Sequence, residues 1–307
     1  MLVLGFQGSP RKKGNTSFLL KNFMQAVEKL GAQTRIIEVT QKNIIPCKEY
    51  VVCERKGYCP IDDDVKTEIY PLIRQAEVVV LATPIFFFNM SAQLKALVDR
   101  CQLFWARKYK LKLTDPAKKT KRGFLLAVGA SKGKSLFEGL QLTAKYFFDA
   151  IDAGFEGSLT YREIEGPKDM AKHPKVLADI EKAAADLIGP LLDRKKILFA
   201  CRENACRSQM AGAFAQFMAG DKFEVITAGS EPAEQVNPDM IKVMHEKGID
   251  MAYRVPQGIE SAISETTPQF IVTMGCSEEC PFVPGAQMLD WDLPDPAGKP
   301  PDFMRQV

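Results

Sequence analysis

Short apolar runs alternate with amphipathic stretches from residue 1 to about residue 190. In the amphipathic stretches, apolar residues recur every three or four positions, which predicts helices, and the runs predict strands. We expect strands at 2–6, 34–39, 77–82, 123–129 and 155–161, and helices at 16–30, 90–106, 135–151 and 174–192. Because apolar strands alternate with helices, this half is predicted to form a parallel sheet covered on both faces.

The same alternation begins again after residues 193–196, and Gly189-Pro190 is expected to break the helix before it. We therefore expect two domains, residues 1–193 and 194–307. Strands of the second are expected at 197–200, 223–228, 270–274 and about 287–290, and helices at 207–219, 237–248 and around 257–263. The predicted fold class is α/β, with two doubly wound parallel-sheet domains.

Composition narrows the possible partners and the compartment. The 307 residues are 46% hydrophobic and 26% charged, as in ordinary globular proteins, and a net charge of +3 is too small to indicate nucleic acid. The longest apolar run, 78–88, contains Thr83 and Pro84 and is too short to span a bilayer. A strand begins almost at the N-terminus, so we expect no signal peptide and a cytoplasmic, reducing location for the eight cysteines.

A cysteine stands at the end of the first strand of the second half. Arg207 and Ser208 follow Cys201 by six and seven residues, and an amphipathic helix comes next. Such a strand-loop-helix aims backbone N–H groups and a helix N-terminus at one point, which suits a tetrahedral oxyanion. The same field favours the Cys201 thiolate. The alternative, a buried structural cysteine, is disfavoured by the neighbouring charges of Arg202 and Glu203.

Two more features of the second half carry candidate chemistry. Cys276 and Cys280 are separated by three residues in a stretch that follows a predicted strand and contains two glutamates. Asp295 precedes a proline in Trp-x-Leu-x-Asp-Pro and could give a proton to a leaving oxygen. The alternatives are two buried thiols and an Asp-Pro turn.

Taken together, these motifs resemble the low-molecular-weight tyrosine phosphatase superfamily, specifically its arsenate reductase branch, over residues 196–300. The resemblance implies a low-molecular-weight phosphatase-like fold and a loop that binds arsenate or a phosphate-like oxyanion through backbone N–H groups and Arg207. It also implies that Asn204 and Ser208 orient or stabilise Cys201, which attacks arsenic, and that Asp295 protonates the departing oxygen.

The same resemblance implies how the nucleophile is regenerated. Cys276 attacks the sulfur of Cys201 and expels arsenite, and Cys280 then attacks Cys276, so that the disulfide ends on the 276–280 pair. Each step is a thiolate exchange at sulfur. Cys206 lies inside the loop, where we expect a structural or protective role.

Two loops of the first half are placed to bind a ligand. Residues 8–17 join the first strand to the first helix, where ligands bind in open parallel sheets, and their hydroxyl, amide and Arg11 groups suit a monophosphate. Residues 83–91 follow the central strand, and their three phenylalanines could wall a planar ring. The alternatives are a common Gly-Ser-Pro connector and core packing.

The first half resembles the flavodoxin-like NAD(P)H-dependent FMN reductases, in particular their iron–sulfur flavoprotein branch. The matching motifs are Gly-Ser-Pro-Arg at 8–11, Gly-Asn-Thr at 14–16, Thr-Pro-Ile-Phe-Phe at 83–87 and Gln-Leu-Lys-Ala at 93–96. The likeness covers most of residues 1–190 and implies FMN and NAD(P)H as cofactors, with a homodimer by analogy. It implies that the FMN phosphate contacts Ser9, Arg11, Asn15, Thr16 and Ser17. It also implies that the flavin ring contacts Pro84, Ile85, Phe86, Phe87, Phe88 and Asn89, and that a loop starting at Gly129 lies beside the ring.

One departure from that branch concerns its cysteines. The branch often carries four after the second strand, whereas Cys47, Cys53 and Cys59 are three, with Tyr50 where another would be expected. Three thiolates are one short of a four-Cys cluster. We therefore interpret them as reduced thiols near the flavin and assign no metal.

Because both halves occur in one chain, we hypothesise that the first half supplies electrons from NAD(P)H to the second. Cys47, Cys53 or Cys59 could carry these electrons. Thioredoxin could serve instead, leaving the flavin half to another substrate. The rival functions are a tyrosine phosphatase with an appended flavin domain and a non-catalytic arsenic or redox sensor.

Overall fold

The computed structural model describes residues 1–265, 267–275 and 283–307. This part of the chain divides into two compact units. The first comprises Met1–Lys112 and Thr120–Leu192, and the second comprises Leu113–Lys119 and Asp193–Val307. The second unit thus includes a seven-residue segment that precedes β4 in the sequence. Each unit is built on its own sheet.

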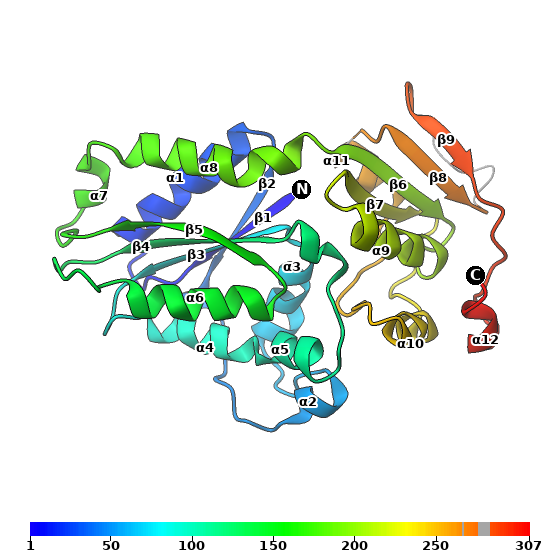
Figure 1. Ribbon diagram of the computed structural model, residues 1–307, viewed down its shortest axis with the longest axis horizontal. Coiled ribbons are helices and arrows are strands. Elements are labelled where there is room, and N and C mark those ends of the chain that lie inside the picture. The colour runs from blue at the N-terminus through cyan, green and yellow to red at the C-terminus, as the bar shows by residue number, and fades with distance from the viewer. Residues whose placement is uncertain (266, 276–282) are drawn as a thin grey trace. The chain divides into compact units, whose positions relative to one another are not determined.

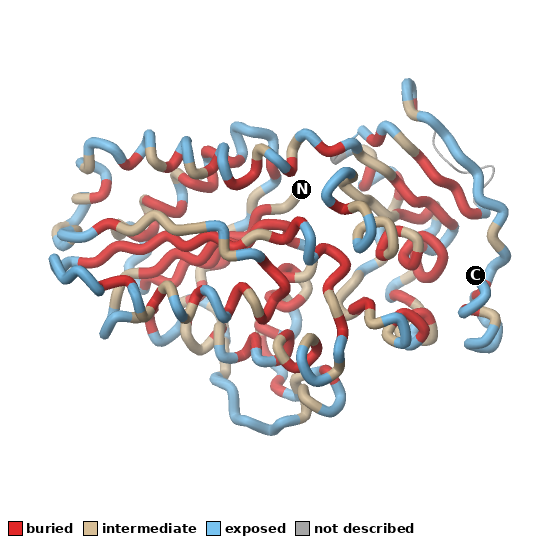
Figure 2. Tube along the Cα trace, viewed as in Figure 1, coloured by how far each residue is buried: buried red, intermediate tan, exposed pale blue. Residues whose placement is uncertain are grey.

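Five parallel strands form the sheet of the first unit, in the order β2-β1-β3-β4-β5. They are β1 (Leu2–Gln7), β2 (Gln33–Glu38), β3 (Val78–Pro84), β4 (Arg122–Val128) and β5 (Gly154–Tyr161). This is the flavodoxin-like order, with its topological switch between β1 and β3. The central strands β1 and β3 are buried except at one end residue each, Leu2 and Pro84, as expected for a sheet covered on both faces (Figure 2).

Helices cover both faces of this sheet (Figure 1). The helices of this unit are α1 (Asn15–Lys29), α2 (Val52–Lys56), α3 (Tyr70–Gln75), α4 (Ala92–Arg100), α5 (Gln102–Tyr109), α6 (Glu138–Ala150), α7 (Asp169–Lys172) and α8 (Val176–Leu192), with the short 3-10 helix η1 (Val39–Gln41) and the π-helix η2 (Val65–Ile69). A further 3-10 helix, η3 (Pro116–Lys119), lies in the segment that belongs to the second unit. α1 and α8 lie on one face, and α4, α5 and α6 on the other. The fold is therefore doubly wound, as predicted.

Two expectations about helix limits are wrong. The helix expected at 90–106 is two helices, because the chain turns at Cys101, whose N–H is shared between the carbonyls of Leu97 and Val98. Gly189-Pro190 does not break α8, which runs on to Leu192. A proline at 190 removes only one N–H donor near the end of the helix, and the buried side chain of Leu191 holds the last turn against the core.

Four parallel strands form the sheet of the second unit, in the order β7-β6-β8-β9. Its elements are β6 (Lys195–Cys201), α9 (Arg207–Ala219), β7 (Phe223–Gly229), α10 (Pro238–Glu246), α11 (Ile259–Glu265), β8 (Phe270–Met274), β9 (Gln287–Asp290) and α12 (Pro301–Met304). One face of the sheet packs against α9 through Phe199 and Val272, and the other against α11 through Leu198 and Ile271. Both predicted domains therefore have the α/β fold expected from the sequence.

Each sheet has a topological switch point, where the connections that leave two neighbouring strands run to opposite faces of the sheet. In the second unit these strands are β6 and β8, and Cys201 lies opposite Met274 at their carboxyl ends. Open parallel sheets bind ligands at such points. The two sequence-derived candidate sites therefore occupy equivalent positions in the two units. Within the described ranges, no helix is long and apolar enough to cross a membrane.

Candidate functional site: an oxyanion loop and a flavin-type loop

The loop after β6 has most of its backbone carbonyls engaged by the chain that follows β7. The carbonyls of Cys201, Arg202, Glu203 and Ala205 accept hydrogen bonds from backbone N–H groups of residues 230, 231, 233 and 237. In the part of the chain that is described, no backbone carbonyl accepts the N–H groups of residues 203–208. A loop whose carbonyls are satisfied and whose N–H groups are not is an anion-binding nest, and it opens directly into the N-terminus of α9.

A hydroxyl group is positioned to donate to the thiol of Cys201. Ser208 Oγ lies 3.0 Å from Cys201 Sγ and accepts a hydrogen bond from Asn204 Nδ2 at 2.7 Å. Because the amide of Asn204 already supplies a donor to this oxygen, the Ser208 proton is free to point at the sulfur. Ser208 and Asn204 are fully buried, so this contact is not diluted by solvent.

Three residues that the sequence did not single out hold Asn204 in this orientation. Asn204 Oδ1 accepts from Gln209 Nε2 and from the Gln257 N–H, both at 3.0 Å, which leaves Nδ2 to face Ser208. Arg254 donates in turn to Gln209 Oε1 at 3.5 Å. Asn204 also has a left-handed backbone, at φ 49°. Its side chain is therefore fixed from both ends.

Arg207 begins α9 and forms an ion pair with Asp295. The distance from Nη2 to Oδ2 is 2.7 Å, and Nη1 also donates to the carbonyl of Leu293 at 3.1 Å. The guanidinium side chain is only 8% exposed, whereas that of Asp295 is 53% exposed. The structure thus brings the predicted cationic group and the predicted proton donor together beside the nest.

Gly275 lies against the same guanidinium. A Cβ added at Gly275 would stand 2.8 Å from Arg207 Nη1, so the guanidinium would have to shift, and the backbone φ of +71° is strained for any residue other than glycine. The chain therefore reaches the oxyanion site directly before Cys276. Cys276 and Cys280, the predicted relay thiols, lie outside the described residues.

Cys206 lies in the loop with Cys201 but in a different environment. It is 5% exposed and packs in an apolar cluster with Met210 and Val236. Burial, followed by the nearby Asp295 carboxylate and Cys201, raises the pKa of Cys206 to about 12. It is therefore a neutral thiol at physiological pH and no rival to Cys201 as nucleophile.

The loop after β1 in the first unit has the features of a phosphate seat. α1 starts at Asn15 with no side chain capping its first N–H groups, and the hydroxyls of Thr16 and Ser17 are buried there. Ser9 Oγ accepts from the Arg11 N–H at 3.2 Å, which curls the loop, while Arg11 itself is exposed. An uncapped helix N-terminus with nearby hydroxyls and a cation binds phosphate readily.

The loop after β3 is tied to this seat. Ser91 caps α4 and donates through Oγ to the Gly8 carbonyl at 2.5 Å. Its backbone N–H donates to Thr83 Oγ1 at 3.2 Å. A Cβ on Gly8 would approach Leu94 to 2.8 Å, so the glycine permits this close packing. Thr83 and Ser91 were not among the predicted site residues, although they fix the distance between the two loops.

The three phenylalanines of the second loop are exposed, which excludes core packing. Phe86 and Asn89 pair through two backbone hydrogen bonds of 2.8 and 3.0 Å, closing a tight turn. Phe87 and Phe88 form its corners with φ 49° and 61°. Left-handed backbone is unfavourable for bulky residues, so this turn stores strain. Exposed aromatic rings held beside a phosphate seat suit a planar ligand.

Two predicted cofactor residues have most of their polar groups engaged within the protein. Asn15 Nδ2 donates to the Gly166 carbonyl at 3.0 Å and its Oδ1 accepts from the Met170 N–H at 3.1 Å. Gly129 donates to Tyr161 and accepts from Ile164 through its backbone. Asn15 thus orders a neighbouring loop, and Gly129 marks the start of one at the carboxyl end of β4.

Cys47, Cys53 and Cys59 lie in the segment around α2. Cys47 is exposed and the other two are partly buried. Burial, followed by the proximity of Cys59 and Cys47, raises the pKa of Cys53. Among the described residues, no group of three or more His, Cys, Asp or Glu is arranged to hold a metal ion. With three thiols where four would be needed, these residues do not fit a four-Cys iron–sulfur cluster.

Comparison with known proteins separates the two halves. A family model for NADPH-dependent FMN reductases matches residues 1–151. An iron–sulfur flavoprotein of Methanocaldococcus jannaschii is 40% identical over 100 residues, which are 33% of this chain and 51% of that protein. One of Methanosarcina thermophila is 33% identical over 132 residues, which are 43% of this chain and 65% of that protein. The chain thus spans about half to two thirds of these relatives.

The second half matches a different family over residues 196–307, the low molecular weight phosphotyrosine protein phosphatases. Arsenate reductase 2 of Staphylococcus haemolyticus is 38% identical over 113 residues, which are 36% of this chain and 84% of that protein. A solved structure of an arsenate reductase in the phosphate binding state is 31% identical, covering 36% of this chain and 86% of its own, with a TM-score of 0.33. The chain therefore belongs to the low molecular weight phosphotyrosine protein phosphatase family through its second half, among relatives that include arsenate reductases, and its first half is similar to NADPH-dependent FMN reductases.

Proposed function

We propose that this protein is an arsenate reductase that draws its electrons from NAD(P)H through its first unit. The observation that carries the proposal is the arrangement around Cys201. A buried hydroxyl faces the sulfur at 3.0 Å, a nest of free N–H groups surrounds it, and Arg207 and Asp295 stand together at the edge. A nucleophile, a binding site for the oxyanion and a proton donor are the three groups that nucleophilic displacement at an oxyanion requires.

In the proposed first step, arsenate enters the nest and Arg207 turns from Asp295 to the oxyanion. The Cys201 thiolate attacks arsenic, a sulfur–arsenic bond forms, and an arsenic–oxygen bond breaks. Once Arg207 has turned away, the Asp295 carboxylate takes up one proton from the bound dihydrogen arsenate and passes it to the departing oxygen, which leaves as water. Ser208 stabilises the thiolate through its O–H before attack. Arsenic is still in the +5 state at this point, held on Cys201.

In the second step, the Cys276 thiolate attacks the sulfur of Cys201. A disulfide forms between them, and the electron pair of the sulfur–arsenic bond stays on arsenic, which leaves as arsenite in the +3 state. Cys280 then attacks Cys276 and restores the Cys201 thiolate. The position of Gly275 against Arg207 supports this role, because the residue before Cys276 already stands at the oxyanion site. Each turnover leaves one disulfide on Cys276 and Cys280.

The residues of the first unit fit FMN. The uncapped N-terminus of α1, with Ser9, Thr16 and Ser17, would hold the phosphate, and the exposed turn of residues 86–89 would lie against the ring. FMN bound there would accept two electrons from NAD(P)H and release them as a pair. The number matches the two electrons needed to reduce one disulfide. We propose that the first unit reduces the Cys276–Cys280 disulfide in this way.

The test is NAD(P)H oxidation by the purified, FMN-loaded chain under anaerobic conditions, with and without arsenate and without thioredoxin. Arsenate-dependent oxidation that is lost in Cys201→Ser and in Cys280→Ser supports the proposal. NAD(P)H oxidation with an artificial electron acceptor should survive both substitutions, because neither residue belongs to the first unit.

Two other outcomes would replace the proposal. Arsenate reduction that appears only when thioredoxin and its reductase are added would assign the electron supply to thioredoxin. The family of the second half also includes phosphatases, and Cys201, Arg207 and Asp295 alone would suffice for a phosphoenzyme. Steady hydrolysis of an aryl phosphate, unchanged in Cys276→Ser and Cys280→Ser, would identify a phosphatase.

A further inference from the structure

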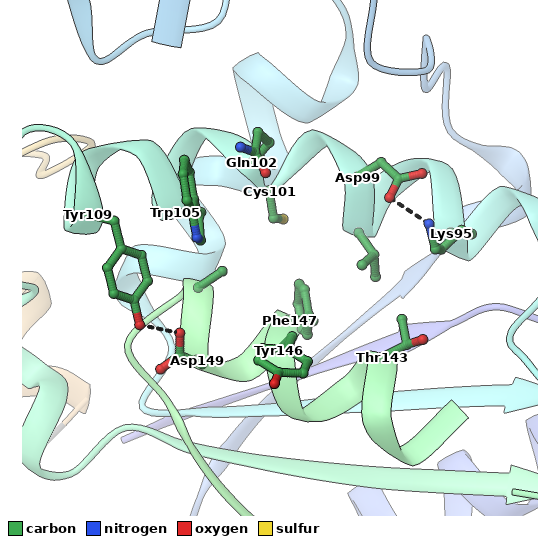
Figure 3. Close-up of a pocket in the computed structure, with 12 residues that line it drawn as sticks. Lys95, Asp99, Cys101, Gln102, Trp105, Tyr109, Thr143, Tyr146, Phe147 and Asp149 are labelled. Atoms are coloured by element: carbon green, nitrogen blue, oxygen red, sulfur yellow. Dashed lines mark hydrogen bonds and ion pairs between the residues drawn. The ribbon is translucent and has the colours of Figure 1, made fainter. Parts of the chain in front are cut away.

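Buried polar groups are almost always hydrogen-bonded, so a buried group without a partner calls for an explanation, such as a bound ion or ligand. The groove between α4–α5 and α6, with a volume of about 460 Å³, has no such group among its lining residues in the part of the chain that is described. Several of its polar side chains pair with one another, as the Lys95–Asp99 and Tyr109–Asp149 contacts in Figure 3 show. The groove therefore specifies no ligand.

Gln7, at the carboxyl end of β1, does carry a buried group without a partner. The residue is 1% exposed, and its Nε2 has no hydrogen-bond partner among the described residues. Its Oε1 accepts a hydrogen bond from the Ser9 N–H at 2.5 Å. Because an N–H group bonds to the oxygen of a side-chain amide and not to its nitrogen, this contact fixes which end of the amide is free. The group left over is a donor.

The side chain of Gln7 lies on the face of the sheet that α1 covers. A Cβ on Gly5 would meet Leu20 and Met24 of that helix, and side chains two residues apart on a strand share a face. Since α1 runs back along β1, Gln7 faces the first turn of the helix. The two ends of one amide group are only about 2.3 Å apart, so the free Nε2 lies beside Ser9 in the loop between β1 and α1.

Other donors of this loop are already engaged. The Arg11 N–H donates to Ser9 Oγ at 3.2 Å, and the Gly14 N–H donates to the Arg11 carbonyl at 3.2 Å. The first N–H groups of α1 have no side-chain cap. Gln7 Nε2 thus joins these N–H groups as a donor that lacks an acceptor at the same end of the helix. Free donors that converge on a helix N-terminus suit a phosphate group.

One neighbouring carboxylate is an alternative acceptor for Gln7. Glu38 lies opposite Gln7 in the register of β1 and β2, and its Oε2 is likewise buried without a partner. No hydrogen bond joins the two side chains in the described structure. The donor of Gln7 is therefore left for a ligand, and Glu38 provides the control for an experiment.

We propose that Gln7 binds the terminal phosphate of the flavin through Nε2 and so helps the chain to select FMN over riboflavin. The inference rests on the proposed flavin function of the first unit. Oε1 continues to hold the Ser9 N–H, and a phosphate oxygen supplies the acceptor that Nε2 lacks. Gln7 lies outside the sequence motifs that indicated a flavin site.

Titration of the full-length, flavin-free chain with FMN and with riboflavin tests this role, because the two ligands share the ring and differ in the phosphate. Gln7→Glu keeps an oxygen for the Ser9 N–H and replaces the free donor with a second oxygen. It should weaken FMN binding by about 10- to 100-fold or more, the effect of losing one hydrogen bond to a charged group, and leave riboflavin binding unchanged. Gln7→Leu removes the donor without adding a charge and should show the same selective loss. Glu38→Gln, the control in the neighbouring strand, should leave FMN affinity unchanged or raise it.

Three results would overturn the assignment, with thermal unfolding confirming that each variant is folded. Equal losses of FMN and riboflavin affinity in both Gln7 variants would mean that the side chain only shapes the loop. Unchanged FMN affinity in both would mean that Nε2 takes no part in binding. A loss of FMN affinity in Glu38→Gln as large as in Gln7→Glu would assign Nε2 to Glu38.

In these three cases the wild-type chain still binds FMN, so the proposed flavin function stands while the role of Gln7 fails. A wild-type chain that binds neither flavin would instead overturn the proposed flavin function, and the assignment of Gln7 with it.

Discussion

Arg207 and Asp295 neutralise each other at the mouth of the oxyanion loop, with Nη2 and Oδ2 2.7 Å apart. Both groups have other proposed partners, an oxyanion for the guanidinium and a leaving oxygen for the carboxyl. An oxyanion that binds Nη2 would compete with Asp295 for it, because a guanidinium donates its hydrogen bonds along the edges of its plane and Asp295 already occupies this edge. Binding would therefore release the acid at the moment it is needed.

Asp295→Asn should separate binding from chemistry. The amide cannot give up a proton to the departing oxygen, so the rate of the first step should fall by about 10²- to 10³-fold. Inhibition by inorganic phosphate should become stronger or stay the same, because Arg207 loses its anionic competitor. Rapid-quench measurement of arsenite formation and phosphate inhibition constants would provide both numbers. A parallel loss of rate and phosphate affinity would mean that Asp295 only positions Arg207.

Gly275→Ala should weaken the oxyanion site. The added methyl group would lie 2.8 Å from Arg207 Nη1, and the φ of +71° is strained for alanine. Gly285→Ala is the matched control, since its φ is +83° but its Cβ would meet nothing within 4 Å. Both should lose about 1 kcal/mol of stability from the backbone term. Only Gly275→Ala should also raise the arsenate KM, by about tenfold or more, and equal kinetics in the two variants would contradict the contact.

Alkylation should distinguish Cys201 from Cys206. Burial, Asp295 and Cys201 raise the pKa of Cys206 to about 12, so its thiolate is scarce below that pH and appears only as the pH rises towards it. At pH 7, iodoacetamide should therefore label Cys201 and leave Cys206 unmodified, as peptide mass spectrometry can determine. The label on Cys201 should disappear when phosphate saturates the loop. Preferential labelling of Cys206 at pH 7 would contradict its buried, neutral state.

The sequence predicted the parts of the site that are close in the chain or carried by strong motifs. Cys201, Asn204 and Ser208 lie within one loop, and the structure joins them by hydrogen bonds. Asp295 came from a motif 88 residues beyond Arg207, and the structure pairs the two. Their part in catalysis stays a prediction.

What the sequence could not provide depends on tertiary packing. Gln257 contacts Asn204 across 53 residues, and no local pattern distinguishes it from other glutamines. The exposure of the three phenylalanines was open because apolar residues after a buried strand are usually core. Likewise, the amphipathic pattern at 90–106 runs unbroken through Cys101, where the chain ends one helix and begins another.

Relieving the backbone strain at Phe87 should raise the stability of the first unit and weaken its binding of FMN. Phe87 has φ 49° and no packing contacts to lose, so Phe87→Gly should stabilise the first unit by about 1 kcal/mol. Thermal unfolding should show the gain, and FMN titration should show weaker binding. Phe86→Gly, at a position without a positive φ, should give no such gain.

The orientation of Asn204 gives the last prediction. Gln209 Nε2 and the Gln257 N–H both donate to Asn204 Oδ1, and this leaves Nδ2 for Ser208 and the Ser208 proton for Cys201. Gln209→Leu removes one of the two donors and leaves Arg254 without this acceptor. The amide of Asn204 can then rotate, and in the flipped state its oxygen accepts the Ser208 proton that otherwise faces the sulfur. The rate of Cys201 alkylation at neutral pH should fall by about tenfold, the effect of one hydrogen bond to a charged group.

Gln209→Glu is the control, because glutamate has nearly the size of glutamine but changes the direction of the hydrogen bond. Its carboxylate cannot donate to Asn204 Oδ1 yet still accepts from Arg254. If the glutamate variant reacts as slowly as the leucine variant while both fold and bind phosphate, the orientation of Asn204 controls the nucleophile. If Gln209→Glu reacts like the wild type, packing at position 209 matters and hydrogen-bond direction does not.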